Sequence, residues 1–215
     1  MDLQLQGKVA IVPASSSGLG RAVALSFGRE GARVVMCSRD QAAIDEAADE
    51  VRGTGAEVLA VTADVTKPDE IESLISAAAG RFGGVDILVT NAGGPPAGTF
   101  DRFDDDAWQA AFNLTLMSSV RLIRGVLPLM RSGGGGSIVA MTSSSIKQPI
   151  PNLLLSNVMR SGVAAMIKTL ADEVAGDNIR VNTVVPGRIA TPRIAQLDQA
   201  NAEKLGVDVA TMRDR

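Results

Sequence analysis

The chain has 215 residues, of which 46% are hydrophobic and 21% are charged, and its net charge is −3. This length suits one domain with a sizeable core, and the slightly acidic balance argues against a nucleic-acid partner. The sequence contains no histidine and no tyrosine, which excludes histidine-ligated metal, histidine acid–base catalysis and proton transfer by a phenol.

Apolar, β-branched runs alternate with longer Ala-rich amphipathic stretches along the chain. In chain order, the runs that read as buried strands are 9–12, 33–37, 57–62, 85–89, 138–142 and 179–185. The stretches that read as helices are 19–30, 41–52, 68–82, 104–131 and 152–174. Pro128 is expected to bend or end the fourth helix, and 132–137 to form a turn. The remainder, 186–215, is polar and weakly patterned.

This alternation predicts an α/β fold, a doubly wound parallel sheet with helices on both faces. We find no internal repeat and no domain boundary, so residues 1–215 are expected to form a single domain. Ligands of such sheets bind at the carboxyl ends of the strands, where the strand order reverses. The residues directly after each strand are therefore the candidates for function.

The first strand is followed by a turn of small residues, 13–21, that leads directly into a helix. Small side chains let a phosphate approach the backbone, and the helix N-terminus offers free N–H groups and a positive dipole end. The candidate cofactor-binding residues of this loop are Ser15, Ser17, Gly18, Leu19 and Gly20. The alternative is a tight turn that binds nothing.

The second strand ends at Ser38 and Arg39, where a dinucleotide-binding fold recognises the adenosine ribose. A carboxylate at this position would repel a 2′-phosphate, whereas a hydroxyl with a guanidinium suits one. We therefore expect NADP(H) rather than NAD(H). Asp40 could pair with Arg39 and weaken this preference.

Polar residues also follow the third and fourth strands. Asp64 and Val65 come after the third strand, and Asn91, Ala92 and Gly93 come after the fourth. The carboxylate and the amide could hydrogen-bond an adenine edge and fix the loop. Either could equally act as a helix cap or a turn residue.

Several motifs occur together in a fixed order. They are the glycine loop at 13–20, Asp64, 91–93, Asn113 within 112–114, the serines after the fifth strand, and 182–191 with Pro186 and Gly187. Through these motifs, residues 5–191 resemble the short-chain dehydrogenase/reductase family, and within it 3-oxoacyl-(acyl carrier protein) reductase-like members. The resemblance implies a Rossmann-like sheet, a nicotinamide cofactor, and reversible hydride transfer between that cofactor and a carbonyl or an alcohol.

The resemblance also implies where the parts of the cofactor lie. Gly18 and Gly20 are expected at the pyrophosphate, and Asp64 and Val65 at the adenine. Asn91 and Ala92 are expected at the ribose. The residues expected around the nicotinamide are Pro186, Gly187, Ile189 and Thr191.

The family's catalytic centre combines a serine, a tyrosine and a lysine with a helix asparagine, and only two of the four carry over. Ser143 matches the serine and Asn113 the asparagine. Counting from Ser143 places Ser156 at the tyrosine position and Arg160 at the lysine position. Because residues four apart share a face of a helix, both side chains could still point into the site.

These two replacements change the chemistry. A serine hydroxyl is a far weaker acid than a phenol, and arginine is permanently charged, so neither is a good proton donor. Arg160 could still hold ribose hydroxyls or place a positive charge near a developing alkoxide. Lys147, in the loop after Ser143, or water could supply the proton; an ordinary solvated lysine is the other interpretation. We therefore expect slow turnover, or a substrate that needs little proton assistance.

Two further departures from the family bear on the site. Pro13 and Ala14 stand where the family has Thr-Gly. Pro13 lacks a backbone N–H, and Ala14 adds a Cβ where the chain turns tightly. Nothing after Thr191 reads as the family's last strand, so 191–215 is expected to be an incomplete substrate-covering segment. The sheet would then lack its C-terminal strand and expose the sixth strand to water or to a partner.

The sequence also bears on location and assembly. No apolar run approaches the roughly 18 residues of a membrane span, and the N-terminus lacks the basic-then-apolar build of a signal peptide. Cys37 is the single cysteine and cannot form an internal disulfide, which suits a reducing compartment. We expect a cytoplasmic protein with no membrane partner, and the resemblance implies a homodimer or homotetramer.

Two functions are consistent with these observations. The first is an NADP(H)-linked oxidoreductase with an atypical centre that reduces a small-molecule carbonyl, of the 3-oxoacyl type or another ketone. The second is a catalytically inactive, nucleotide-binding family member that regulates or scaffolds another protein. The missing tyrosine and the pair at 13–14 favour the second function, whereas Ser143, Asn113 and 91–93 favour the first.

Overall fold

One parallel sheet forms the centre of the molecule. The computed structural model describes residues 1–213, and within them the strands pair in the order β3-β2-β1-β4-β5-β6, all parallel. Their bounds are β1 (Val9–Pro13), β2 (Arg33–Ser38), β3 (Val58–Thr62), β4 (Ile87–Thr90), β5 (Gly136–Met141) and β6 (Ile179–Val184). The predicted strands and the parallel doubly wound sheet are confirmed, with strand ends shifted by one or two residues.

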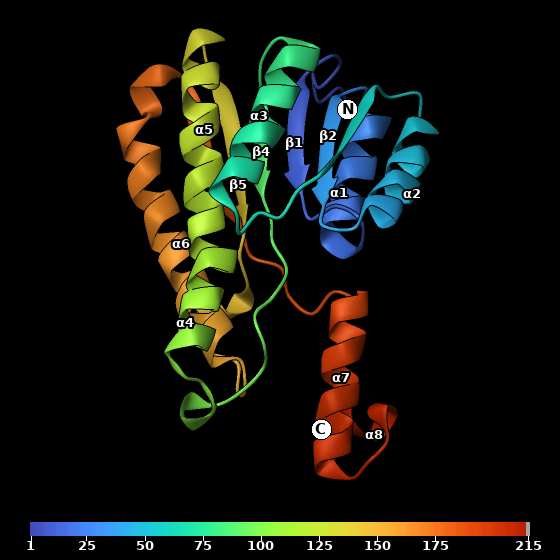
Figure 1. The fold of residues 1–215 in the computed structure, drawn as a ribbon, viewed down its shortest axis with the longest axis vertical. Helices are drawn as coiled ribbons and strands as arrows, with labels where there is room; N and C mark the ends of the chain where they lie inside the picture. The colour runs from blue at the N-terminus through green and yellow to red at the C-terminus, as the bar shows by residue number, and fades with distance from the viewer. Residues whose placement is uncertain (214–215) are drawn as a thin grey trace.

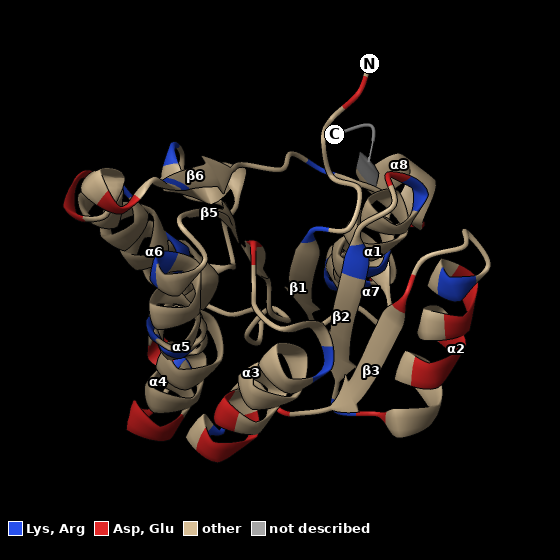
Figure 2. Ribbon diagram, turned by 90° about the horizontal axis from the view of Figure 1, so that it is seen from above, with Lys and Arg blue, Asp and Glu red and all other residues tan. Residues whose placement is uncertain are grey.

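The helices lie on both faces of this sheet (Figure 1). Their bounds are α1 (Gly18–Arg29), α2 (Gln41–Arg52), α3 (Pro68–Phe82), α4 (Asp105–Ala111), α5 (Ser118–Ser132), α6 (Leu154–Glu173), α7 (Pro192–Leu205) and α8 (Val209–Arg213). Residues of α3, α5 and α6 share one apolar core with the sheet, and residues of α1 and α2 share another on the opposite face. Figure 2 shows acidic residues on the outward-facing turns of α2 and α3.

The predicted helix at 104–131 is interrupted. A π-helical turn, η2 (Phe112–Met117), separates α4 from α5. Pro128 does not end the helix, as one of the two expected outcomes required, because α5 continues through Pro128 to Ser132. Pro128 lies on the exposed side of α5. The carbonyl that loses its helical donor there can therefore be hydrated.

The sequence analysis missed two helices. The segment 186–215, read as weakly patterned, contains α7 and α8. The Thr191 side chain caps α7 by accepting a hydrogen bond from the Ile194 N–H at 3.3 Å, Pro192 opens its first turn, and Gly206 ends it at a φ of 64°. These are standard start and stop signals of a helix.

The edge of the sheet and its switch point both matter for function. β6 is an edge strand, the described residues contain no strand beyond it, and Val184 at its end is 44% exposed. The strand order reverses between β1 and β4, so the loops that follow these two strands diverge and open a space at their carboxyl ends. Across the described residues, none of the helices has the length and apolar character to span a membrane.

Candidate active site

A cavity of about 900 Å³ occupies the carboxyl end of the sheet. The loops after all six strands line it, together with the first turns of α1, α6 and α7. Figure 1 shows α7 standing beyond the ends of β1 and β2, at the edge toward which the strand arrows point. The predicted site residues that line the cavity are Ser17, Gly18, Leu19, Gly20, Ser38, Arg39, Asp64, Val65, Asn91, Ala92, Gly93, Ser143, Ser156, Arg160, Pro186, Gly187, Ile189 and Thr191.

Two predicted site residues, Ser15 and Asn113, lie outside this lining. Ser15 is fully buried beneath the loop, and its N–H donates to the Cys37 carbonyl at 3.1 Å. Asn113 lies in η2, where its Oδ1 accepts a 3.4 Å hydrogen bond from Arg121, while the neighbouring Leu114 lines the cavity instead. The resemblance implied a catalytic position for Asn113, but it lies in a π-helical turn, where the helical period is changed, and its side chain bonds Arg121.

The loop after β1 is held in a strained conformation. Ala14 has a φ of 48°, in the left-handed region that favours glycine. The Asn91 side-chain amide donates to the carbonyls of Pro13 at 3.2 Å and Ala14 at 3.3 Å, and so fixes the turn. Gly20 has no room for a side chain, because a Cβ there would collide with the Ala14 carbonyl.

The start of α1 presents donors to the cavity. Gly18 adopts a φ of 57°, and Ser17 at the N-cap forms no side-chain cap. The first N–H groups of a helix have no acceptor within it. An anion at this end of the cavity would meet these N–H groups and the positive end of the helix dipole.

The tip of β2 carries an unpaired cation. Asp40 caps α2 by accepting a hydrogen bond from the Ala43 N–H at 3.0 Å, and its backbone N–H and carbonyl bond the Ser38 hydroxyl. Arg39 is exposed and forms no ion pair within residues 1–213. Asp40 therefore does not neutralise Arg39.

The tip of β3 is built around a turn. The Asp64 carboxylate accepts a hydrogen bond from the Thr66 N–H at 2.9 Å, as in an Asx-turn. Cys37 lies nearby and is 1% exposed. Burial, reinforced by the negative charge of Asp64, raises the pKa of the Cys37 thiol to about 11. Cys37 is therefore a neutral packing residue at neutral pH.

Three of the predicted catalytic side chains, Ser143, Ser156 and Arg160, line this cavity. Ser143 follows β5 and caps the short turn η3 (Ser144–Ile146) by accepting a hydrogen bond from the Ser145 N–H at 3.1 Å. Ser156 and Arg160 lie one turn apart on α6, and Arg160 Nε donates to Ser156 Oγ at 3.2 Å. Arg160 Nη1 also donates to the Met141 carbonyl at 3.1 Å, which ties α6 to the end of β5.

The surroundings of Arg160 are unusual for an arginine. It is partly buried and forms no ion pair with any residue that the structure describes. Burial lowers the pKa of Arg160, and the positive charge of Arg193 lowers it further. An arginine pKa begins so high that the guanidinium still carries its charge at neutral pH. Lys147, the other candidate cation, is exposed and does not line the cavity.

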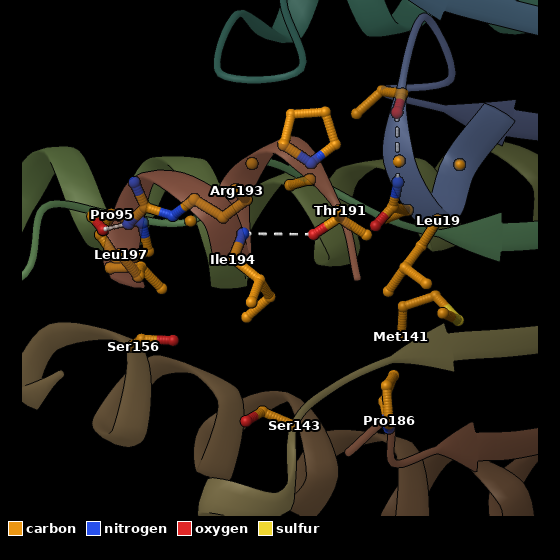
Figure 3. A pocket seen from close by; sticks show the side chains of 18 of the residues that line it. Leu19, Pro95, Met141, Ser143, Ser156, Pro186, Thr191, Arg193, Ile194 and Leu197 are labelled. Atoms are coloured by element: carbon orange, nitrogen blue, oxygen red, sulfur yellow. Dashed lines mark hydrogen bonds between the residues drawn. The ribbon is translucent and has the colours of Figure 1, made fainter. Parts of the chain in front are cut away.

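The sequence analysis missed one wall of the cavity. Arg193, Ile194 and Leu197, all on α7, line it opposite Ser143 and Ser156 (Figure 3). Arg193 Nη2 donates to the Pro95 carbonyl at 2.8 Å. The capping sequence at Thr191 could have revealed this wall, because a helix that begins directly after the sixth strand's loop must pass over the carboxyl ends of the strands.

The sheet order, the glycine loop and the cavity at the switch point define a nucleotide-binding α/β protein of the Rossmann-like class. The family model described as short chain dehydrogenase matches residues 8–202. The chain therefore belongs to the short-chain dehydrogenase/reductase family.

Curated relatives from distant organisms agree with this assignment. The chain is 35% identical over 202 residues to dehydrogenase/reductase SDR family member 4 of Sus scrofa, covering 93% of this chain and 72% of the relative. It is 33% identical over 211 residues to the uncharacterized oxidoreductase YvrD of Bacillus subtilis, covering 98% of this chain and 80% of that protein.

Solved structures show the same architecture. L-sorbose reductase from Gluconobacter frateurii, complexed with NADPH and L-sorbose, superposes with a TM-score of 0.92 at 38% identity, covering 98% of this chain and 81% of that one. Actinorhodin polyketide ketoreductase with NADPH superposes with a TM-score of 0.91 at 32% identity, covering 95% and 79% of the two chains.

Proposed function

We propose that this protein is an NADP(H)-linked oxidoreductase that reduces a ketone, of the 3-oxoacyl type or another, with a serine–arginine pair in place of tyrosine and lysine. One observation carries the proposal. A single cavity contains the glycine loop, the unpaired Arg39 and the Ser143, Ser156 and Arg160 cluster. A cofactor bound along the loop and a carbonyl at the cluster would share that space.

The residues present fit the cofactor. Gly18 and Gly20, at the uncapped start of α1, would hold the pyrophosphate. Arg39 would hold the 2′-phosphate, because its guanidinium forms no ion pair within residues 1–213 and the neighbouring Asp40 carboxylate caps α2. Ser38 could contribute only by giving up the bond that its O–H donates to the Asp40 carbonyl. The cavity volume of about 900 Å³ is also large enough for a dinucleotide. The relatives seen with NADPH support the same choice of cofactor.

The chain's own groups can stabilise a reacting carbonyl oxygen. When bound, NADPH supplies the hydride. Arg160 Nε donates to the Ser156 oxygen, so the Ser156 O–H is left free to donate to the substrate. The positive charge of Arg160 lies one hydrogen bond behind that hydroxyl and would stabilise the alkoxide as it develops.

The proton that completes the alcohol would come from water. Neither a serine hydroxyl nor a guanidinium has a pKa near neutrality, and general acid catalysis contributes about 10²–10⁴-fold in enzymes that have it. We therefore expect turnover to be slow by a factor of that order. The second candidate function, a nucleotide-binding regulator, is favoured by the strained Ala14 and the absence of a phenol.

We further propose a cytoplasmic homodimer or homotetramer. A shallow second cavity on the outer surface of α4 and α6 supports self-association, because Trp108, Phe112 and Met159 line it. Val158, in the same part of α6, is 45% exposed. Met159 is buried and Trp108 and Phe112 are half-buried, so the exposed apolar surface here consists of parts of Trp108 and Phe112 together with Val158, and covering it would favour a protein contact.

Calorimetric titration with NADPH and NADH tests the cofactor assignment. NADPH should bind more tightly than NADH, and Arg39→Ala should remove about 10- to 100-fold of that preference, which is typical of a charge-assisted hydrogen bond. Arg124→Ala, an exposed position on α5 outside the cavity, is the matched control and should change neither affinity. Equal affinities for the two nucleotides, or no binding of either, would contradict the assignment.

A further inference from the structure

Two guanidinium groups approach the substrate end of the cavity. Arg160 reaches it from α6 beside Ser156, and Arg193 reaches it from the first turn of α7. Both line the same cavity, and the positive charge of Arg193 adds to burial in lowering the pKa of Arg160. Figure 3 shows Arg193 on the wall of the cavity that faces Ser156.

Within residues 1–213, the hydrogen-bond partners of these two cations are uncharged oxygens. The hydrogen bonds of Arg160 go to the Met141 and Thr142 carbonyls and to Ser156, and that of Arg193 goes to the Pro95 carbonyl. Neither arginine forms an ion pair within residues 1–213.

The acidic residues that line the cavity are Asp40 and Asp64, which belong to its adenine end and are engaged in a helix cap and a turn. Asp198 forms its ion pair with Arg188. Two positive charges in a cavity of reduced dielectric repel one another. An anion bound between them would replace this repulsion with attraction. The substrate end is therefore electrostatically complementary to a negative group.

We propose that Arg160 and Arg193 bind the carboxylate of the substrate, so that this enzyme acts on a carbonyl compound that is itself an acid. The proposal rests on the function proposed above. The carboxylate would lie against the two guanidinium groups, and the carbonyl oxygen would face the hydroxyls of Ser143 and Ser156. Each guanidinium keeps N–H groups beyond those bonded to the protein, so each can donate a charge-assisted hydrogen bond to a carboxylate oxygen.

The rest of the wall is apolar. Ile150, Leu153, Ile194 and Leu197 line the same cavity, and their side chains would cover a hydrocarbon portion of the substrate. A short oxo acid with an apolar chain combines both features.

The arginine pair is also separate from the proposed sites of the cofactor phosphates. Those sites are the start of α1 and the tip of β2, where Arg39 stands. A Cβ built at Gly18 would lie 3.7 Å from the Thr191 side chain, so Thr191 marks the limit of the pyrophosphate loop. Arg193 lies beyond Thr191 and turns toward Pro95. This placement separates Arg193 from the proposed phosphate sites and favours a role for it in binding the substrate.

Calorimetry with acetoacetate and its neutral methyl ester tests the inference, with and without saturating NADP⁺. Wild-type protein should bind acetoacetate about 10- to 100-fold more tightly than the ester, and Arg193→Gln should lose about tenfold or more of that preference. Arg39→Gln should weaken NADP⁺ binding and leave the preference for the acid intact. Arg124→Gln, outside the cavity, should alter neither quantity.

The outcomes separate this inference from the reductase assignment. A clear preference for acetoacetate that is lost in Arg193→Gln supports the inference even if no turnover is seen. Equal binding of acid and ester, no binding of either probe, or an Arg193→Gln variant that weakens NADP⁺ instead of acetoacetate would overturn it. Reduction of the methyl ester with no preference for the acid would leave the reductase standing and the carboxylate site refuted.

Discussion

In the proposed function, Ser156 and Arg160 stand in place of a phenol and an amine, and the hydrogen bond between them decides what each can do. The 3.2 Å hydrogen bond from Arg160 Nε fills an acceptor site on the serine oxygen, which orients its O–H outward. The pair is therefore suited to polarising a carbonyl and unsuited to delivering a proton. The chemistry at this centre becomes electrostatic more than acid–base.

Ala14 is strained because it adopts a backbone conformation that favours glycine. Its φ of 48° places a Cβ in the left-handed region, at a cost of about 1–2 kcal/mol. The two hydrogen bonds from Asn91 hold the turn in place against that strain. The sequence analysis anticipated a tight turn at 13–14, although the compensating amide could be identified only from the fold.

Ala14→Gly should therefore stabilise the protein. The substitution removes the left-handed strain at this position. It also makes the unfolded chain more flexible, which costs about 0.4–1 kcal/mol of stability. Because the strain is the larger of the two, we expect the free energy of unfolding to rise by about 0.5 kcal/mol. Urea denaturation measures this quantity. Ala22→Gly, at an exposed position inside α1, is the control and should cost about 1 kcal/mol. A loss at Ala14 equal to the loss at Ala22 would show that the strain is absent.

At the scale of elements, α7 forms a wall of the cavity and is attached mainly through side chains. The Arg188–Asp198 ion pair joins the loop after β6 to α7, with the Asp198 side chain only 1% exposed. Arg193 bonds Pro95 at 2.8 Å, and Lys204 bonds the Asn152 side chain at 3.3 Å. The three partners lie after β6, after β4 and before α6, so segments far apart in the sequence hold α7 in position.

Removing Arg188 should loosen α7 selectively. Arg188→Ala takes away a charge partner of a buried carboxylate, which raises the free energy of the docked helix. We expect amide exchange within α7 to accelerate by a factor of about ten or more, with little change in the strands. Hydrogen-exchange mass spectrometry resolves the two regions. Arg52→Ala, which removes an exposed pair with Asp49 in α2, should leave α7 unaffected; unchanged exchange in both variants would refute the anchoring role.

At the scale of the whole molecule, the sheet was predictable from local patterns, and so was the gathering of most candidate site residues around one cavity. Apolar strands alternate with amphipathic helices, and the residues after parallel strands converge on one edge. The position of Asn113 was not predictable, because η2 changes the helical period only where α4, α5 and α6 pack together. Arg193 was missed for a different reason: its helix carries clear caps but little apolar patterning.

The arrangement as a whole supports one chemical conclusion. The glycine loop, Arg39, the α6 pair and Arg193 of α7 line one cavity. The proposed hydride transfer gives the hydroxyls and guanidinium groups in this cavity a role, whereas nucleotide binding by a regulator does not require them. Hydride transfer to a bound carbonyl is therefore the central claim.

The most direct test is to supply NADPH deuterated at the transferable hydrogen, together with acetoacetate, neutral ketones and a 3-oxoacyl thioester. The account predicts slow oxidation of the cofactor and deuterium at the carbinol carbon of the product, with the hydroxyl proton coming from water. It also predicts that acetoacetate is preferred over its methyl ester. Tight NADPH binding with no deuterium transferred to any of these carbonyls would contradict the claim and favour the regulatory function.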